Sequence, residues 1–322
     1  MTPVLPSAPR LALAMPVYNG AAYLGEALDA LQAQTEADWV AVVTDNASTD
    51  DTPEIVREHA EADPRIRYHR NETNLGANGN FNRSMALAVE TGAPFVKWAA
   101  HDDCPHPAYL ATCLAALEAH PEAVGAHSAI RLIDGDGEPY PYSARAGGFV
   151  ASADDLWRWD PADLQVYERP DPSERLARFL RAKSGEWMTY GVFRSDAVAK
   201  TRPFAMPGVE DALCAELLLR GPVRFVRETL FDHRLHAASA RHLSRDEYLE
   251  YETGERPVSP VLPSIGRAVD FARAIGRAPL SPAATVRSFA ALVSFAAGLG
   301  RLRNLVVPGP HNYLGLDFSR RS

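Results

Sequence analysis

Short apolar runs alternate with amphipathic stretches over the first 130 residues of the chain, and this pattern predicts the fold. The apolar runs resemble strands that are buried on both faces of a parallel sheet. In the stretches between them, apolar residues recur every three or four positions, which is the spacing of one helix face. Such alternation predicts a doubly wound, mostly parallel α/β sheet with flanking helices and right-handed crossovers. The strands are predicted at 11–16, 39–45, 65–70, 94–99 and 123–130, and the helices at 20–33, 48–62, 76–91 and 107–119.

The pattern changes after residue 130. Residues 134–172 are rich in Gly, Pro, Asp and aromatic side chains, so we interpret them as loops that form a flap. Regular periodicity then returns, with strand character at 187–194 and again at 223–236, where it predicts one or two strands. Helices are predicted at 173–183 and at 210–220, the second ending before Gly221.

The last part of the chain is rich in Ala and Arg and predicts two helices, at 262–277 and 282–303. The second helix has an apolar face that includes Val286, Phe289, Val293 and Phe295, and we expect this face to pack on the domain or on a second copy of the chain. A helix that lies on a membrane surface normally carries more basic charge than the helix predicted at 282–303, so we favour packing over membrane binding. We therefore expect one domain over 1–241, in two halves at about 1–130 and 131–241, and a C-terminal helical extension over 242–322.

Composition and charge narrow the classes of function. The formal net charge is −8, with 33 Lys and Arg against 41 Asp and Glu, which disfavours a nucleic-acid-binding protein. The three cysteines are few and odd in number, as is usual for reduced thiols in the cytoplasm. Neither a signal-peptide pattern nor an uncharged run of about 18–20 apolar residues is seen. We therefore expect a cytoplasmic protein without a transmembrane segment.

Unusual polar residues follow several of the predicted strands. The segments are Pro16 to Asn19, Asp45 with Asn46, the loop at 71–80, and Asp102 with Asp103. In an open parallel sheet, ligands bind beyond the carboxyl ends of the strands. Each segment alone also fits a turn or a helix cap, but together they predict one polar cleft. Because adjacent carboxylates at the edge of a core need compensation, the cleft suits a divalent cation that holds a diphosphate.

These motifs resemble glycosyltransferase family 2 on the GT-A fold. The resemblance is carried by "AMPVYNGAAYLGEALDALQAQTEADWVAVVTDNASTDDT", "NLGANGNFN" and "HDD". It covers residues 11–130 closely and 185–240 more loosely. It implies that the first half of the domain binds a nucleotide-sugar and that the second half binds the acceptor.

The resemblance also assigns a nucleotide pocket. Asp45 would accept hydrogen bonds from the base, as a carboxylate can. Gly76 would let the backbone come close to the nucleotide. The residues assigned to the base and ribose pocket are Pro16, Val17, Tyr18, Asn19, Asp45, Asn46, Asn74 and Gly76.

The acidic motif of the family binds Mg²⁺ or Mn²⁺, and here it departs from the usual Asp-x-Asp. Ala100 and His101 precede Asp102 and Asp103, so the first acid is missing. We expect Asp103 to bind the metal and Asp102 to contact the ribose or a bound water.

The family also carries a histidine in an R-x-H context. His236 matches it and would complete the metal shell or contact the diphosphate, and His233 is the weaker choice. Ser239 and Arg241 would bind phosphate if their loop closes over the donor.

Inverting members of the family place the catalytic base in an acidic pair, and Glu210 and Asp211 match it. The base takes the proton of the acceptor hydroxyl during attack on the anomeric carbon. We prefer Asp211 as the catalytic base and keep Glu210 as the alternative. Acids also favour the first turn of any helix, so this pair alone is weak support. Trp157 and Trp159 are candidates for an acceptor lid.

The expected activity is transfer of a sugar from a nucleoside diphosphate donor, with UDP preferred and dTDP or GDP open, to an acceptor hydroxyl or amine that the sequence does not identify. A nucleotidyltransferase and a non-catalytic sugar-nucleotide-binding protein are the alternatives. A dinucleotide dehydrogenase is excluded because G-x-G-x-x-G does not follow the first strand, where "PVYNG" stands instead. A P-loop is not present in the sequence either.

Overall fold

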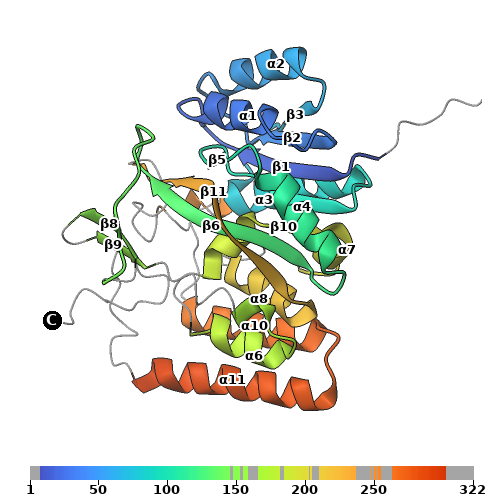
Figure 1. Cartoon of the computed structure of the whole chain (residues 1–322), viewed down its shortest axis with the longest axis vertical. Coiled ribbons are helices and arrows are strands. Elements are labelled where there is room, and N and C mark those ends of the chain that lie inside the picture. Colours follow the sequence, from blue (N-terminus) through green and yellow to red (C-terminus); the bar gives the residue numbers. More distant parts are fainter. Residues whose placement is uncertain are drawn as a thin grey trace, which may run out of the picture.

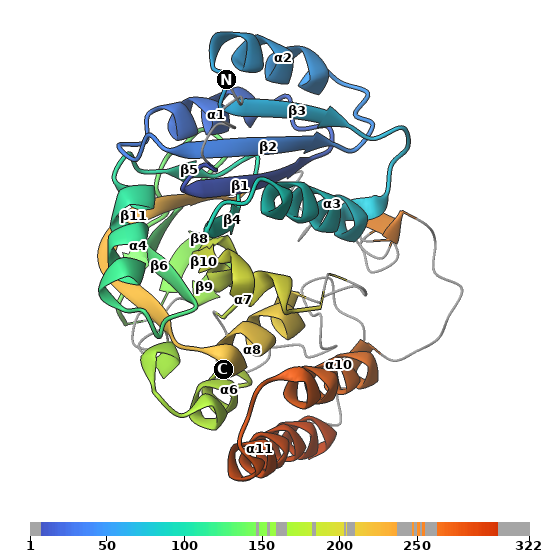
Figure 2. The same cartoon turned by 90° about the vertical axis from the view of Figure 1, so that its right-hand side faces the viewer.

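A computed structural model gives the architecture (Figures 1 and 2). The residues that the structure describes are 8–145, 148–152, 155–158, 166–181, 185–202, 204, 210–236, 247, 250–251, 253–254 and 263–301. A central sheet is flanked by helices, and two further helices lie at the C-terminal end of the described chain.

The central sheet has eight strands in the order β3-β2-β1-β4-β10-β6-β11-β5. β10 is antiparallel to both of its neighbours, and β5 is antiparallel to β11. The other pairs are parallel, which confirms the predicted mostly parallel α/β fold. All residues of β1 and β2 are buried, as expected for strands covered on both faces. The strands are β1 (Leu11–Val17), β2 (Trp39–Asp45), β3 (Ile66–Arg70), β4 (Phe95–Trp98), β5 (Cys104–Pro105), β6 (Gly125–Ile133), β10 (Val192–Arg194) and β11 (Val223–Arg234).

The helices begin and end at residues suited to those positions. Asp171 caps α6 by accepting a hydrogen bond of 2.8 Å from the Ser173 N–H. Gly92, just after α3, has a φ of +78°, which favours glycine. The helices are α1 (Leu24–Gln32), α2 (Thr52–Ala62), α3 (Gly76–Glu90), α4 (Tyr109–Ala119), α6 (Pro172–Phe179), α7 (Ser195–Ala199), α8 (Glu210–Arg220), α10 (Pro263–Arg277) and α11 (Pro282–Arg301), with 3₁₀ turns η1 (Val166–Glu168) and η2 (Gly185–Tyr190).

Two predictions in the middle of the chain were wrong. The region expected to be loops contains a small antiparallel sheet of β7 (Tyr142–Ser143), β8 (Gly148–Ser152) and β9 (Asp155–Arg158). It is stabilised by Phe149, which is buried and packs edge-to-face on Tyr142. The expected strand at 187–194 begins as the 3₁₀ turn η2, and only β10 is extended.

The C-terminal helices α10 and α11 confirm the helices predicted at the end of the chain, and they pack against α8 and α6. Phe271 of α10 contacts Phe179 edge-to-face, and both side chains belong to the main core. Arg277 pairs with Glu216 at 2.6 Å, and Arg287 pairs with Asp171 at 2.7 Å. The two helices are thus joined to the second half of the domain.

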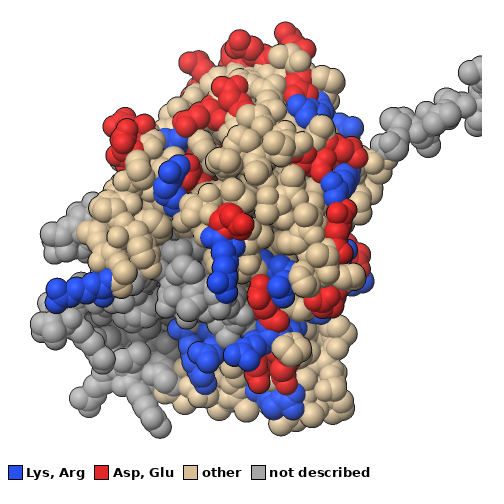
Figure 3. All heavy atoms as spheres, in the orientation of Figure 1, with Lys and Arg blue, Asp and Glu red and all other residues tan. Residues whose placement is uncertain are grey.

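Charge is distributed unevenly over the surface. On the face shown in Figure 3, acidic side chains gather over α1 and α2, while basic side chains lie lower down among further acidic ones.

In the described part of the chain, none of the helices combines the length and the apolar character needed to cross a bilayer.

Candidate active site

The register of the sheet aligns the strand ends that carry the predicted site. Val17 at the end of β1 is paired with Asp45 at the end of β2, and Asp45 is paired with Arg70 at the end of β3. β11 runs parallel to β6, and Arg234 is its last residue. Because parallel strands end at one edge, polar residues from separate segments meet there.

Asp45 is fully buried and its carboxylate is surrounded by donors. It accepts hydrogen bonds from the Ser48 N–H at 2.8 Å and from the Tyr68 hydroxyl at 2.7 Å. The Arg70 guanidinium pairs with the same carboxylate and donates to the Ser48 carbonyl at 2.8 Å. These contacts compensate the buried charge and leave Arg70 beside the expected base pocket.

The loop after β3 is held against Asp45 by side-chain amides. The side-chain oxygen Oδ1 of Asn46 accepts hydrogen bonds of 2.9 Å from the Asn71 side-chain amide and of 2.9 Å from the Leu75 N–H. The Asn46 amide donates to Asn74 Oδ1 at 2.8 Å and to the Gly76 carbonyl at 3.2 Å. Gly76 has a φ of +70°, so another residue would be strained there. Asn46, Asn74 and Gly76 therefore lie together, as the sequence predicted.

The turn after β1 contacts both the second strand end and the acidic motif. Pro16 and Val17 are buried, whereas Tyr18 and Asn19 are exposed. The Asn19 N–H donates to Ser48 Oγ at 2.9 Å. A Cβ atom on Gly20 would lie 2.6 Å from the His101 ring and 2.6 Å from a Val17 methyl group, which leaves no room for a side chain.

Asp102 and His236 form a close pair at the sheet edge. Asp102 Oδ2 lies 3.0 Å from His236 Nε2. Burial disfavours ionisation of Asp102, but His101, His236 and His233 outweigh it and lower the pKa of this carboxyl to about 2. The His236 ring also lies against Tyr23, with ring centroids 4.7 Å apart.

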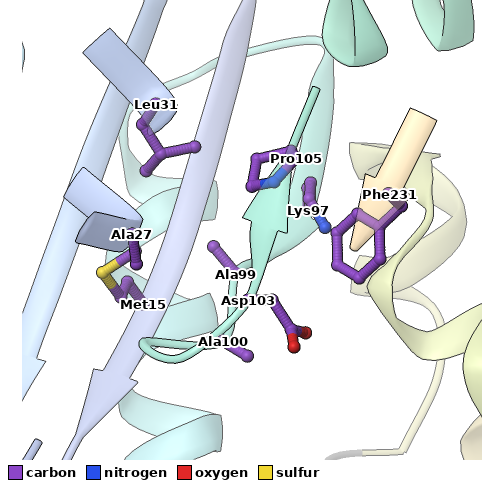
Figure 4. Close-up of a pocket in the computed structure, with 9 residues that line it drawn as sticks. All are labelled: Met15, Ala27, Leu31, Lys97, Ala99, Ala100, Asp103, Pro105 and Phe231. Atoms are coloured by element: carbon purple, nitrogen blue, oxygen red, sulfur yellow. The ribbon is translucent and has the colours of Figure 1, made fainter. Parts of the chain in front are cut away.

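Asp103 faces the interior instead. It is 2% exposed, its Oδ1 accepts the Arg234 N–H at 3.1 Å, and the same oxygen lies 2.9 Å from His233 Nδ1. Its Oδ2 is buried without a hydrogen-bond partner among the described residues. Figure 4 shows Asp103 with Lys97 and Phe231 around a cavity of about 10 Å³, which is close to the room that one water molecule needs.

The buried Lys97 is a functional-site neighbour that sequence reasoning missed, because it lies within the apolar run of β4. Its ammonium group donates to the Trp98 carbonyl at 2.9 Å and to the Tyr190 carbonyl. The rings of Phe231 and Tyr109 lie 4.9 and 5.2 Å from it. Burial lowers the pKa of Lys97 from 10.5 to about 7, although Asp103 acts in the opposite direction.

The expected catalytic acids open α8. Asp211 is partly exposed in the first turn. One turn further, Cys214 Sγ lies 3.2 Å from the Thr189 hydroxyl, so α8 packs on η2. The side chains of Glu210 and Trp157, and the whole of Trp159, Ser239 and Arg241, lie outside the described residues.

The Asp102 and His236 atoms suit a divalent cation. Their separation of 3.0 Å is also that of adjacent ligands around an octahedral ion with bonds of about 2.1 Å. Over the described ranges, no group of three or more His, Cys, Asp or Glu side chains is arranged for a metal. Mg²⁺ is usually held by one or two carboxylates together with substrate phosphates. The Asp102 carboxylate fits that set, and the His236 imidazole would add a nitrogen ligand.

Comparison with protein families decides the family. The model of glycosyl transferase family 2 matches residues 12–196, which is more than half of the chain. The chain belongs to glycosyl transferase family 2. By class it is therefore a glycosyltransferase, as the motifs at the strand ends predicted.

Curated relatives match part of this family 2 glycosyltransferase. An uncharacterised protein of Sinorhizobium fredii is 31% identical over 122 residues, which are 37% of this chain and 13% of the relative. A GalNAc(5)-diNAcBac-PP-undecaprenol beta-1,3-glucosyltransferase of Campylobacter jejuni is 32% identical over 96 residues, 30% of each chain. The chain thus spans about a third or less of the curated relatives named here.

Solved structures show the same fold over a larger share. The 1-349 part of TarS of S. aureus, solved in complex with UDP-GlcNAc, superposes with a TM-score of 0.62 at 17% identity, covering 92% of this chain and 75% of that one. A second TarS structure, in complex with UDP, has a TM-score of 0.59 at 16% identity, covering 89% of this chain and 70% of that one. At these identities the likeness establishes the GT-A fold alone.

Proposed function

We propose that this glycosyltransferase moves a sugar from a nucleoside diphosphate donor to an acceptor hydroxyl or amine, with inversion at the anomeric carbon and with Mg²⁺ or Mn²⁺. The observation that carries the proposal is the Asp102–His236 pair, which lies at the same sheet edge as Asp45 and Asn46. A cation site and a nucleotide pocket side by side suit a sugar nucleotide.

Asp102 and His236 would hold the metal, which neutralises the charge of the diphosphate as it leaves. The burial of Asp103 and its contact with the Arg234 N–H favour Asp102 over Asp103 as the ligand, the reverse of our preference from the sequence. Asp103 would instead support the loop from inside.

Asp45, with Arg70 and Tyr68, would recognise the base. The fully buried Asp45 carboxylate would hold the Arg70 guanidinium and the Tyr68 hydroxyl in place, and Arg70 would supply donors that suit carbonyl oxygens of a pyrimidine. UDP is the preferred donor nucleotide, in line with the UDP-sugar bound to TarS, and dTDP and GDP are its competitors.

Asp211 would act as the base that takes the proton from the acceptor, with Glu210 as the alternative. Its place in the first turn of α8, a helix that packs on η2, supports a role on the acceptor side. Ser239 and Arg241 would bind phosphate, and a lid at Trp157 and Trp159 would cover the acceptor.

The test measures release of nucleoside diphosphate from UDP-, dTDP- and GDP-sugars with Mn²⁺ and a panel of acceptors. We expect release with UDP-sugars that Asp211→Asn reduces about 100-fold or more. Asp196→Asn is the matched control, because Asp196 is an exposed acid on α7 that pairs only with Lys200 in the described structure. Formation of pyrophosphate and a nucleotide-sugar from UTP and a sugar 1-phosphate, in a separate assay, would indicate a nucleotidyltransferase. Nucleotide binding without any release would indicate a binding protein.

A further inference from the structure

Arg234 connects several parts of the site, although the R-x-H context to which it belongs assigns a role only to His236. It is 2% exposed at the end of β11, two residues before His236. Its backbone N–H binds Asp103 Oδ1 at 3.1 Å. A buried guanidinium is costly unless its donors are satisfied, so its contacts explain why it is there.

The guanidinium binds three other segments. Nε donates to the Asp102 carbonyl at 3.0 Å, and Nη1 donates to the Gly135 carbonyl at 3.1 Å. Nη2 pairs with Glu26 Oε2 of α1 at 2.6 Å. One side chain therefore ties the loop of Asp102, the turn after β6 and helix α1 to the strand that leads to His236.

Tyr23 completes this arrangement. The Arg234 guanidinium lies over the Tyr23 ring at 4.8 Å from its centroid, and the His236 ring lies against Tyr23 at 4.7 Å. A Cβ on Gly135 would lie 3.1 Å from the Tyr23 hydroxyl, so the turn after β6 closes on the same ring. The Tyr23 ring thus contacts both the arginine and the histidine of the R-x-H segment.

We infer that Arg234 and Tyr23 are positioning residues that set the separation of Asp102 and His236. Arg234 fixes Asp102 through its peptide carbonyl, and Tyr23 fixes the His236 ring. A lysine would keep the positive charge, but its three N–H donors sit on one nitrogen and cannot reach the separate positions that the planar guanidinium fork reaches on three segments. The inference rests on the proposed function, since it concerns the metal-binding pair named there.

The experiment measures Mn²⁺ affinity by titration calorimetry with the full chain and saturating UDP, without acceptor. We expect Arg234→Lys and Tyr23→Leu each to weaken Mn²⁺ binding by about 10-fold or more, as loss of groups that orient metal ligands does. Neither substitution removes a negative charge or a metal ligand. A loss of Mn²⁺ affinity would therefore show that the positions of Asp102 and His236 have changed. Arg131→Lys is the matched control, because Arg131 is a half-exposed arginine that pairs with Asp232 and not with the loop of Asp102 or with Tyr23.

Thermal unfolding of each variant accompanies the titration. If Arg234→Lys does not fold, Tyr23→Leu decides, because Tyr23 is only partly buried. Wild-type Mn²⁺ affinity in a folded Tyr23→Leu or Arg234→Lys variant would overturn the inference. Absence of Mn²⁺ binding by the wild-type chain with UDP would instead overturn the metal site of the proposed function.

Discussion

Asp102 and Asp103 are neighbours in the chain, but their carboxylates have different surroundings. Asp102 is beside three histidines at the sheet edge, and Asp103 is in the core with Arg234 and His233. Adjacent side chains often point to opposite sides of an extended backbone, so one can serve the site while the other supports the fold.

This difference predicts separate phenotypes for the two acids. Asp102→Asn should lower Mn²⁺ affinity in the presence of UDP by at least about 10-fold. It should also lower the melting temperature near neutral pH, because the pKa of about 2 shows that the folded state favours the ionised carboxylate. Asp103→Asn should keep the affinity within about 3-fold but lose about 1–3 kcal/mol of unfolding free energy, because an amide replaces a buried carboxylate that accepts the Arg234 N–H and lies 2.9 Å from His233 Nδ1. Calorimetry measures the Mn²⁺ affinity and chemical denaturation measures the stability. Weaker Mn²⁺ binding by Asp103→Asn, with wild-type binding by Asp102→Asn, would identify Asp103 as the metal ligand.

Lys97 predicts a pH dependence of stability. Its pKa is about 7 in the folded chain and 10.5 in an ordinary environment, so between these values the unfolded state binds more protons. The free energy of unfolding therefore contains a part that rises with pH across this window. Between pH 7 and 9 we expect the wild type to gain on the order of 1–2 kcal/mol relative to Lys97→Met.

Urea denaturation at both pH values measures this difference. Lys200→Met is the control, because Lys200 is an exposed lysine on α7 that pairs with Asp196. Its unfolding free energy should follow the wild type at both pH values. Parallel pH curves for the wild type and Lys97→Met would show that Lys97 is not the titrating group.

At the scale of elements, the turn between β1 and α1 controls the approach of the nucleotide motif to the acidic motif. Gly20 N–H donates to the Thr52 hydroxyl at 2.9 Å, so the turn is also tied to the start of α2. The absence of a side chain at Gly20 lets His101 approach, which brings the loop before Asp102 close to β1.

Gly20→Ala should therefore raise the KM for the donor and cost about 1–3 kcal/mol of unfolding free energy, because the new methyl group overlaps His101 and Val17. Gly25→Ala is the matched control, since a Cβ there meets nothing within 4 Å and alanine favours a helix. Gly25→Ala should keep the KM and add up to about 1 kcal/mol. Steady-state kinetics and chemical denaturation are the measurements, and an unchanged KM for Gly20→Ala would contradict the prediction.

At the scale of the whole molecule, the C-terminal helices support the helix that carries the proposed base. Glu216 of α8 is 1% exposed and is paired with Arg277 of α10 and with Arg220. A buried carboxylate that loses a partner is strongly destabilising, so α10 and α8 should behave as one unit.

Arg277→Met should lower the free energy of unfolding by about 2–4 kcal/mol and lower kcat together with it, because α8 begins at the proposed base. Arg273→Met on the same helix is the control: Arg273 is half-exposed, and its partner Asp270 also pairs with Arg202 at 2.8 Å. Denaturation curves and rates for both variants test this. A normal kcat in a destabilised Arg277→Met variant would show that the packing of α10 does not affect catalysis.

The sequence by itself determined the strands and helices of the first half and the edge at which polar residues gather. Apolar periodicity reports which residues are buried, and parallel strands all end at the same edge, so local patterns were sufficient. The same patterns indicated the family, because the motifs follow the strand ends directly.

Only the tertiary structure decided which acid faces the site, that Lys97 is buried among aromatic rings, and that Arg234 connects Asp102 with α1. Asp102 and Arg234 are separated by 132 positions in the chain, and no local pattern encodes a contact over that distance. The small sheet of β7 to β9 was missed for a related reason, since its short strands depend on packing around Phe149 rather than on periodicity. Burial and hydrogen bonding between distant segments therefore set the chemistry of residues whose type the sequence alone reveals.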